Sequence, residues 1–400
     1  MQPTINPVQR RIESIDILRG VVMVIMALDH VRDYFHIASN TDNPLNLVTT
    51  TPLLFFTRWI THFCAPIFVF LSGVSVYLQS QRKTKKELSA FLIKRGTWLI
   101  LLELTVVSFA WSFNPHYQFV FLQVIWAIGI SMIVLGILIW LPFNFILVTG
   151  LFIFFAHNLL DIPESAKAYK ATLFWDLLHH ANFIVYSYAQ HHAVFIAYAF
   201  LPWTGLMLLG YCAGTFFTRQ FSAPQRRKYL LMIGSALIIF FIVLRFINVY
   251  GDPVPWSYQK NGLFTFLSFV NVNKYPPSLL YMSMIIGCAC LFLVFIEKAK
   301  NRFTEIMIIY GRVPFFYYIL HIYLVHLLAV CAFFLRGHQA EEITKTGTKF
   351  PFYFVVPGEG YGLVVVYLLW LAVVIALYPL CRWYNNYKTN HKEKWWLSYL

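Results

Sequence analysis

Residues 10–36 read RRIESIDILRGVVMVIMALDHVRDYFH, a hydrophobic stretch with charged residues at both ends. We expect one membrane-spanning helix over Ile15–Phe35, because about 20 predominantly apolar residues cross the hydrocarbon core of a bilayer. In such a helix Arg19 and His30 share a face and lie about 16 Å apart along the axis. A cation near one interface and an imidazole near the other predict a groove for a long, two-ended ligand.

The composition indicates a polytopic membrane protein. Of the 400 residues, 59% are hydrophobic, 19% are aromatic and only 12% are charged, which is far more apolar than a soluble protein of this size. The net charge of +14 does not indicate nucleic-acid binding, since Lys and Arg occur in short clusters between apolar runs, as in cytoplasmic loops beside anionic lipid. The six cysteines lack zinc-ligand spacing, so we expect reduced packing residues and no metal.

About ten segments are long and apolar enough to cross the membrane. They are Ile15–Phe35, Leu53–Leu78, Gly96–Trp111, Phe119–Leu141, Phe143–Leu160, Val194–Phe217, Tyr229–Val249, Pro277–Ile296, Pro314–Leu335 and Tyr361–Leu380. The sequence therefore predicts an all-α, polytopic membrane fold. We expect a single domain over residues 1–400, with a leader at 1–14 and a tail at 382–400. The leader has no small-residue cleavage site, so the first helix should stay in the mature protein.

The distribution of loop charge predicts which side each terminus occupies. With a cytoplasmic N-terminus, the inner segments carry the dense cationic clusters, and the outer loops carry fewer cations and more carboxylates. The clusters are Arg10 and Arg11; Arg82, Lys83, Lys85, Lys86, Lys94 and Arg95; Arg219, Arg226, Arg227 and Lys228; Lys298, Lys300 and Arg302; and Arg382, Lys388, Lys392 and Lys394. An even number of spans then places both termini in the cytoplasm.

Ionisable side chains inside membrane spans are functional candidates, because each costs roughly 2.5–3.5 kcal/mol on insertion scales. At the outer end of the first span lie Asp29, His30, Arg32 and Asp33. We expect His30 to act as a general base, with the Asp29 carboxylate beside it supporting its basicity. Arg32 and Asp33 fit an ordinary polar helix end as well as a substrate site.

Three further polar residues are expected near the same outer surface. Arg58 and His62 lie towards the outer end of the second span, and Lys274 precedes the eighth. Snorkelling explains Arg58 equally well, and His62 also fits a satisfied core histidine. Pro276 and Pro277 restrict the backbone after Lys274 and should hold it at a fixed height. We assign all three to substrate binding.

Other candidates have supporting roles. Glu103 lies within the third span, and we expect it to pair with an Arg or His of a neighbouring helix and to fix the packing. His321 lies inside the ninth span and is also assigned a supporting role. The loop histidines have no nearby Cys, so no metal is expected there; they are His179, His180, His191 and His192. Hydrolase, nucleotide-binding and zinc-protease motifs are absent from the sequence.

Five stretches resemble the bacterial branch of the heparan-alpha-glucosaminide N-acetyltransferase catalytic-domain family. Two are SIDILRGVVMVIMALDHVRDYF from Ser14 and THFCAPIFVFLSG from Thr61. The others are PWTGLMLLGYCAG from Pro202, FVNVNKYPPSLLYM from Phe269 and YGRVPFFYYILHIYLVH from Tyr310. Together they extend over nearly the whole chain. The spacing of Arg19 and His30 also looks like that of related membrane acyltransferases that modify surface polysaccharides.

This resemblance implies a multi-pass acetyltransferase of the bacterial cytoplasmic (inner) membrane. The expected donor is cytoplasmic acetyl-CoA as co-substrate, with its phosphates near Arg19 and Arg95. The expected acceptor is an amino or hydroxyl group of a sugar-like molecule on the extracytoplasmic side. The family's catalytic histidine corresponds to His30, with His36 and His62 as alternatives. The resemblance is compatible with direct transfer of the acetyl group and with an acetyl-histidine intermediate. It is also compatible with a homo-oligomer.

A transporter or flippase of a small polar or glycan-related substrate is the alternative function. Such a protein would also carry charged residues inside its spans. It accounts less well for an arginine and a histidine on one face of the first helix at opposite membrane depths.

Overall fold

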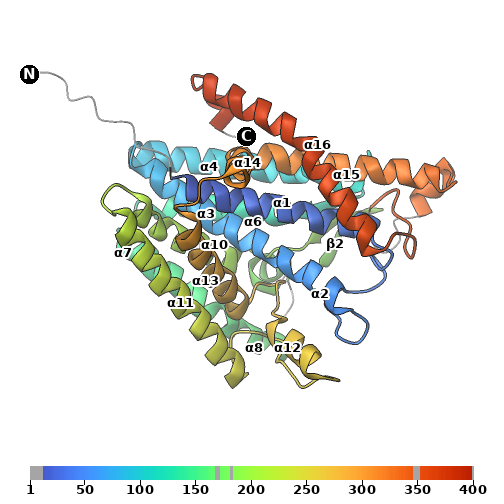
Figure 1. The fold of residues 1–400 in the computed structure, drawn as a ribbon, viewed down its shortest axis with the longest axis horizontal. Coiled ribbons are helices and arrows are strands. Elements are labelled where there is room, and N and C mark those ends of the chain that lie inside the picture. Colours follow the sequence, from blue (N-terminus) through green and yellow to red (C-terminus); the bar gives the residue numbers. More distant parts are fainter. Residues whose placement is uncertain (1–11, 167–171, 181–182, 346–351, 399–400) are drawn as a thin grey trace, which may run out of the picture.

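The computed structural model describes residues 12–166, 172–180, 183–345 and 352–398, so residues 1–11 of the predicted leader lie outside the described residues. The fold is mostly helical, with 71% helix and 5% strand. Figure 1 shows α1, α4 and α15 following the long axis of the molecule, with α7 and α11 crossing it obliquely. The N-terminal helix α1 spans Glu13–Phe35 without a break, as predicted.

Helix α1 lies at the centre of this arrangement and contacts α3, α13, α14, α15 and α16. Its contact with α14 (Arg302–Arg312) depends on two glycines. A Cβ atom on Gly20 would lie 1.9 Å from the carbonyl oxygen of Met307, and one on Gly311 would lie 1.9 Å from that of Asp16. The two backbones therefore touch, and this contact sets the rotation of α1 and thus the direction of its polar side chains.

The helices follow one another with short connections along most of the chain. After α1 come α2 (Pro52–Trp59), η1 (Ile60–Phe63), α3 (Cys64–Ser80), α4 (Lys85–Leu102), η2 (Glu103–Val107), α5 (Ser108–Ser112), α6 (Val124–Leu138), α7 (Phe143–Ala156), η3 (His157–Leu160), α8 (Asp161–Ser165), α9 (Leu173–Trp175), η4 (Asp176–His180), α10 (Phe200–Ala213), η5 (Gly214–Phe217), α11 (Ala223–Ile247), α12 (Gly262–Val270), α13 (Leu279–Ile296), α14, α15 (Pro314–Leu335), η6 (Ala340–Lys345), α16 (Leu363–Asn390) and η7 (Trp395–Ser398).

Each predicted membrane segment overlaps a helix, and seven helices of the described residues are long and apolar enough to cross a bilayer. These seven are Pro52–Ser80, Phe143–Ser165, Phe200–Phe217, Ala223–Ile247, Leu279–Ile296, Pro314–Leu335 and Leu363–Asn390. The length and hydropathy of these helices indicate an integral membrane protein. Ten spans and cytoplasmic termini stay predictions, as does the single domain over residues 1–400.

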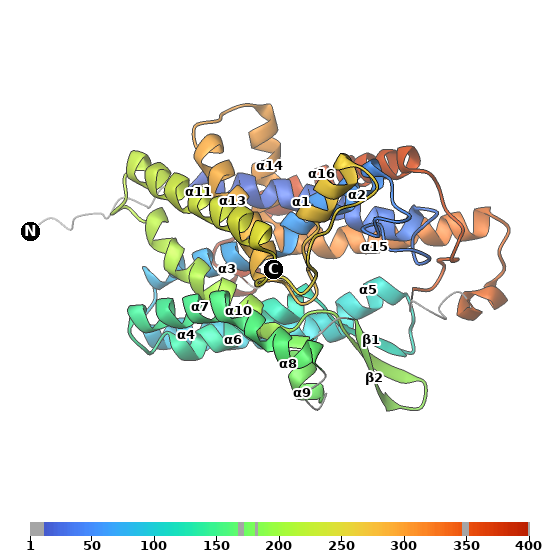
Figure 2. The same cartoon turned by 90° about the horizontal axis from the view of Figure 1, so that it is seen from below.

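The prediction of an all-α fold is wrong in one region. Strands β1 (Phe119–Leu122), β2 (Ile184–Ala189) and β3 (His192–Ile196) form a sheet in the order β1-β3-β2, with β1 parallel and β2 antiparallel to β3. Figure 2 shows this sheet at one edge of the molecule, beyond the ends of most helices. Two predicted spans therefore begin too early, because hydropathy does not separate a short β-branched and aromatic strand from the first turn of a helix.

Several helices begin where a polar side chain accepts a backbone N–H, as expected for N-cap residues. These residues are Thr51 before α2, Thr84 before α4, Ser222 before α11, Asn261 before α12, Ser278 before α13 and Asn301 before α14. The caps at Thr51 and Ser278 matter for function, because they set the starts of the helices next to Arg58 and Lys274.

Candidate active site

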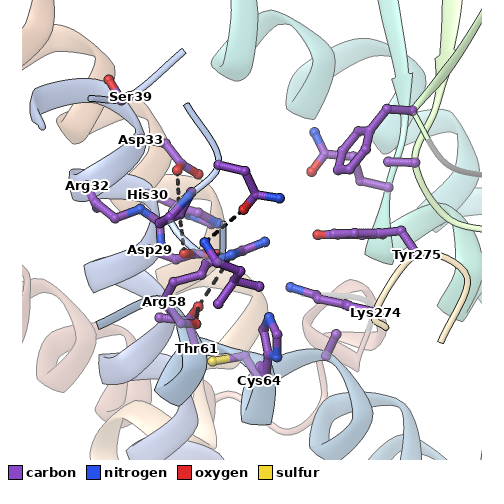
Figure 3. A pocket seen from close by; sticks show the side chains of 18 of the residues that line it. Asp29, His30, Arg32, Asp33, Ser39, Arg58, Thr61, Cys64, Lys274 and Tyr275 are labelled. Atoms are coloured by element: carbon purple, nitrogen blue, oxygen red, sulfur yellow. Dashed lines mark hydrogen bonds and ion pairs between the residues drawn. The ribbon is translucent and has the colours of Figure 1, made fainter. Parts of the chain in front are cut away.

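A cavity of about 1060 Å³ opens at the C-terminal end of α1. Its walls come from α1, the loop between α1 and α2, η1, the sheet and the segment before α13. All seven predicted catalytic and substrate-binding residues line it: Asp29, His30, Arg32, Asp33, Arg58, His62 and Lys274. Figure 3 shows the α1 residues and Arg58 on one side, with Lys274 and Tyr275 pointing towards them from the other. The fold thus gathers side chains from distant parts of the chain around one space.

Asp29 lies between two arginines at the wall of this cavity. Its Oδ1 atom forms an ion pair of 2.8 Å with Nη2 of Arg32, and its Oδ2 atom accepts a hydrogen bond from Nη1 of Arg58. Arg32 also donates to Asp33 at 2.5 Å, and Arg58 donates to Thr61 at 3.4 Å. Charge-assisted contacts of this kind are the strong ones, so the cluster fixes α2 against the C-terminal end of α1. Arg58 is therefore not simply snorkelling to the interface.

Among the described residues Asp29 forms no hydrogen bond to His30, so the carboxylate expected to support the basicity of His30 does not orient its ring. Successive residues of a helix are about 100° apart around its axis, so Asp29 and His30 do not face each other. The partner of His30 is instead His321 on α15, whose Nε2 atom lies 2.6 Å from Nδ1 of His30. The two rings also stack, with centroids 4.8 Å apart and planes 14° from parallel. His321, predicted only as a supporting residue, is thus in direct contact with the proposed base.

The hydrogen bonds assign the ring protons of both histidines. Nδ1 of His321 lies 3.0 Å from the carbonyl oxygen of Tyr317. A carbonyl oxygen only accepts, so this Nδ1 carries the proton and Nε2 of neutral His321 has the lone pair. Nδ1 of His30 must then donate to that lone pair, which leaves the lone pair of neutral His30 on Nε2. His30 lines the cavity and packs edge-on against Trp111, with ring centroids 4.7 Å apart. It has the tautomer that a general base needs.

Lys274 supplies a positive charge from the opposite wall. It is buried, with 8% of its surface exposed, and its ammonium group lies 5.1 Å from the centroid of the Tyr275 ring. Within the described part of the chain it forms no ion pair. The backbone around it is held by Asp252, whose Oδ2 atom accepts from the Asn273 N–H at 2.9 Å and from the Ser278 hydroxyl at 2.7 Å. Lys274 is therefore a well-positioned cation available to a ligand.

The pKa values of His36 and Tyr275, which line the cavity outside the helices, are both shifted. Burial, together with the nearby Arg32 guanidinium, lowers the pKa of His36, the residue directly after α1. Burial alone would raise the pKa of the Tyr275 phenol, but the cations of Lys274 and Arg58 outweigh it, so that pKa is lowered. The Nδ1 atom of His36 already accepts the Ala38 N–H at 3.2 Å. This contact favours His30 over His36 as the base.

His62 differs from an ordinary core histidine, because its ring lines the cavity. Only 1% of its surface is accessible to solvent, yet it lines the cavity, and its ring packs edge-on against Tyr281. Neither ring nitrogen has a hydrogen-bond partner among the residues that the structure describes. A buried polar group normally has a partner, so a ligand in the cavity is the natural partner for His62.

The predicted donor-binding residues lie outside this cavity. Arg19 donates to the carbonyl oxygen of Gly311 at 3.2 Å and to the hydroxyl of Ser75 at 3.1 Å, and it lies 3.6 Å from the Asp16 carboxylate. Arg95 on α4 stacks over Phe91 at 5.8 Å. Neither arginine lines the cavity around His30. The structure does not bring Arg19 and His30 to one space.

Within the described residues Glu103 does not pair with an Arg or His, contrary to the prediction. It is fully buried, and its Oε1 atom accepts the backbone N–H of Gln123 at 2.9 Å, directly before α6. Backbone N–H groups at a helix start are unpaired and carry partial positive charge, so a carboxylate from another helix can cap them. Gln123 in turn lines the cavity. The packing role of Glu103 stays a prediction, and its physical basis would be this tertiary helix cap.

Several residues of the cavity were not singled out from the sequence. Trp111, Gln123, Tyr198, Tyr275 and Phe352 all line it. The only local signal for Tyr275 is its place beside Lys274 and two prolines. For the others, nothing in the sequence separates them from the many aromatic and polar residues of this chain. Aromatic walls suit the flat faces of sugar rings and the apolar arm of a thioester donor.

Comparison with known proteins identifies one family that the chain matches. The family model described as "Heparan-alpha-glucosaminide N-acetyltransferase, catalytic" matches residues 11–245, which is more than half of the chain. The matched part includes Asp29, His30 and Arg58, whereas Lys274 and His321 lie beyond it. No curated protein matches the chain significantly.

Proposed function

Since the chain belongs to the heparan-alpha-glucosaminide N-acetyltransferase catalytic family, we propose that it is a membrane acetyltransferase using cytoplasmic acetyl-CoA. The proposed acceptor is an amino or hydroxyl group of a sugar-like molecule on the extracytoplasmic side. The single observation that carries this proposal is the pairing of His30 with His321 at the cavity, which leaves a basic Nε2 on His30. The proposal does not include heparan, the substrate in the family's name, as the acceptor of this protein.

In the proposed reaction His30 is the general base. Its Nε2 atom takes the proton from the acceptor amine or hydroxyl as the acceptor attacks the thioester carbonyl carbon. The tetrahedral intermediate then collapses, the carbon–sulfur bond breaks, and the imidazolium of His30 returns the proton to the leaving thiolate. The products are the acetylated acceptor and free CoA thiol. His321 holds the His30 ring in the productive tautomer throughout.

The other cavity residues bind the acceptor in this proposal. Unlike Arg32 and Arg58, Lys274 forms no ion pair in the described structure, so it is suited to acceptor oxygens or to the developing oxyanion. Asp33 and His62 offer further hydrogen bonds. Arg32 and Arg58 act mainly through Asp29, because the ion pairs among these three residues shape the wall beside His30.

The donor is proposed to reach this cavity from the cytoplasmic side. Arg19 and Arg95 stay the proposed contacts for CoA phosphates, because arginine binds phosphate with two parallel hydrogen bonds. The Arg19 side chain would have to exchange its contacts with Ser75 and Gly311 for the phosphates. Direct transfer and a transient acetyl-His30 both satisfy this arrangement, and rapid acid quenching with peptide mass spectrometry separates them.

The decisive experiment incubates purified protein and radiolabelled acetyl-CoA with an envelope extract. We expect labelled product with the wild type and a loss of about 10²–10⁴-fold in rate with His30→Ala. His116→Ala is the matched control, because His116 is exposed and outside the cavity, and it should keep full activity. Full activity of His30→Ala would refute the assignment. Substrate counterflow in proteoliposomes without CoA consumption would instead support the transporter alternative.

A further inference from the structure

A second group of polar side chains lies outside the cavity, where the α7 helix ends. Asp161 and Glu164 are on α8, one helical turn apart, and His179 is in η4. One ligand atom from each residue lies within 4.8 Å of the others. His179 is fully buried, and the side chains of Glu164 and Asp161 are 8% and 17% exposed. We propose that His179 and Asp161 bind a divalent transition-metal ion such as Zn²⁺ or Mn²⁺, with Glu164 as the second-shell partner that orients the His179 ring.

The protons of His179 point to the atom that would bind the metal. Its Nδ1 atom lies 2.9 Å from Oε1 of Glu164, and a carboxylate only accepts, so Nδ1 carries the proton. The neutral ring then has its lone pair on Nε2. This Nε2 is buried and has no hydrogen-bond partner in the described parts of the chain. It lies 4.0 Å from Oδ1 of Asp161, too far for a hydrogen bond and close to the separation of two ligands on one ion.

The surroundings of these residues match the second shell of a metal site. Metal-binding histidines usually donate their other ring N–H to a carboxylate, as His179 does to Glu164. Glu164 is itself oriented by the indole N–H of Trp175 at 2.8 Å, and Oδ2 of Asp161 accepts from the Asn158 amide at 2.5 Å. This leaves Oδ1 of Asp161 facing Nε2 of His179.

The donor set decides the class of ion. One imidazole and one carboxylate suit Zn²⁺ or Mn²⁺, whereas Ca²⁺ and Mg²⁺ favour oxygen ligands alone. His157, whose ring lies 5.8 Å from that of His179, is not a further ligand. Its two nitrogens face backbone carbonyl oxygens, those of Ile153 at 2.9 Å and of Pro277 at 3.0 Å. Two protein ligands leave the remaining coordination positions to water.

The position of the ion indicates a structural role. Neither ligand lines the cavity around His30, and neither does Glu164. The adjoining residues nevertheless reach the segment that carries Lys274, because the side-chain Oδ1 atom of Asn158 accepts the Leu279 N–H at 2.7 Å. An ion would therefore join α8, η4 and the start of α13. No metal was expected from the sequence, since His179 was considered without the carboxylates that the fold brings to it.

Metal analysis of the purified protein tests this proposal directly. The tag is removed, the protein is stripped with EDTA, titrated with ZnCl₂ or MnCl₂ and separated from free ion, and bound metal is measured by mass spectrometry together with Tm. We expect one bound ion per chain and a raised Tm. Asp161→Asn and Glu164→Gln keep the side-chain shape and should each weaken binding at least about tenfold.

His180→Gln is the matched control, because His180 is adjacent in sequence but contacts Asp176 at 2.9 Å. It should bind metal as tightly as the wild type. If one of the two test variants fails to fold, the other decides the result. The proposal is overturned if the wild type takes up neither ion, or if both shape-preserving variants bind it as tightly as the wild type. Neither result depends on the acetyltransferase assignment.

Discussion

The Nδ1 atom of His30 lies 2.6 Å from the Nε2 atom of His321, although 291 positions separate them in the chain. This contact replaces the carboxylate that usually orients a catalytic imidazole. A neutral histidine partner supplies the acceptor without adding a charge to a buried site. It also makes the activity of the α1 residue depend on the position of α15.

His321 should therefore act as a positioning residue whose removal affects turnover. His321→Phe keeps a stacked ring but removes the acceptor for the His30 N–H, so we expect kcat to fall about 10²-fold with little change in the acceptor KM. His321→Gln can still accept that proton and should restore part of the activity. Steady-state kinetics together with the pH profile of kcat distinguish this role. Equal losses in both variants with an unchanged pH profile would indicate packing alone.

Lys274 should contribute mainly to acceptor binding. Lys274→Met removes the cation while keeping most of the side-chain length, and we expect the acceptor KM to rise about tenfold or more, which corresponds to one charge-assisted hydrogen bond. Lys274→Arg keeps the charge, and its acceptor KM should lie between those of the wild type and Lys274→Met. Initial rates at varied acceptor and saturating acetyl-CoA give the comparison. An unchanged KM in Lys274→Met would remove this residue from the acceptor site.

The pair Asp29 and Arg58 should be energetically coupled. Removing one partner leaves the other charge buried and unmatched, so Asp29→Asn and Arg58→Met should each destabilise the fold by about 3 kcal/mol. The double variant should lose clearly less than the sum of the two single losses, because no lone charge remains. Unfolding of the purified variants in denaturant measures this coupling. Strictly additive losses would mean that the ion pair contributes nothing.

The raised pKa of His338 predicts that the protein loses stability as the pH rises. Hydrogen bonds to the Glu359 and Glu342 carboxylates, at 2.9 Å and 3.0 Å, raise its pKa above the ordinary value. The folded state therefore binds more protons than the unfolded state between these two pKa values. The contribution is complete below about pH 6.5 and is lost as pH rises through the raised pKa. We expect less than about 1 kcal/mol, because the pairs lie near the surface.

The measurement for His338 is the slope of Tm against pH, compared between the wild type and His338→Gln. The wild type should lose stability across this range relative to the variant, which cannot titrate at this position. Parallel curves for the two proteins would contradict the prediction.

The local pattern of polar residues at the ends of apolar runs was enough to find much of the site. Asp29, His30, Arg58 and Lys274 each stand out as a polar residue at the end of an apolar run, and they do line one cavity. Their partners could not be read in the same way. The roles expected for Asp29 and Glu103 assumed the nearest charged residue, whereas the fold gives them Arg58 and the start of α6.

The sequence by itself determined the long apolar helices, the polar end of α1 and the class of the protein, because hydropathy and helical period are local properties of consecutive residues. Only the tertiary structure decided the sheet, the contact between His30 and His321, and the group of Asp161, Glu164 and His179. These features depend on how each helix is rotated and how far it is shifted against its neighbours. Close contacts such as Gly20 against Met307 set that rotation, and they join segments that no local pattern connects.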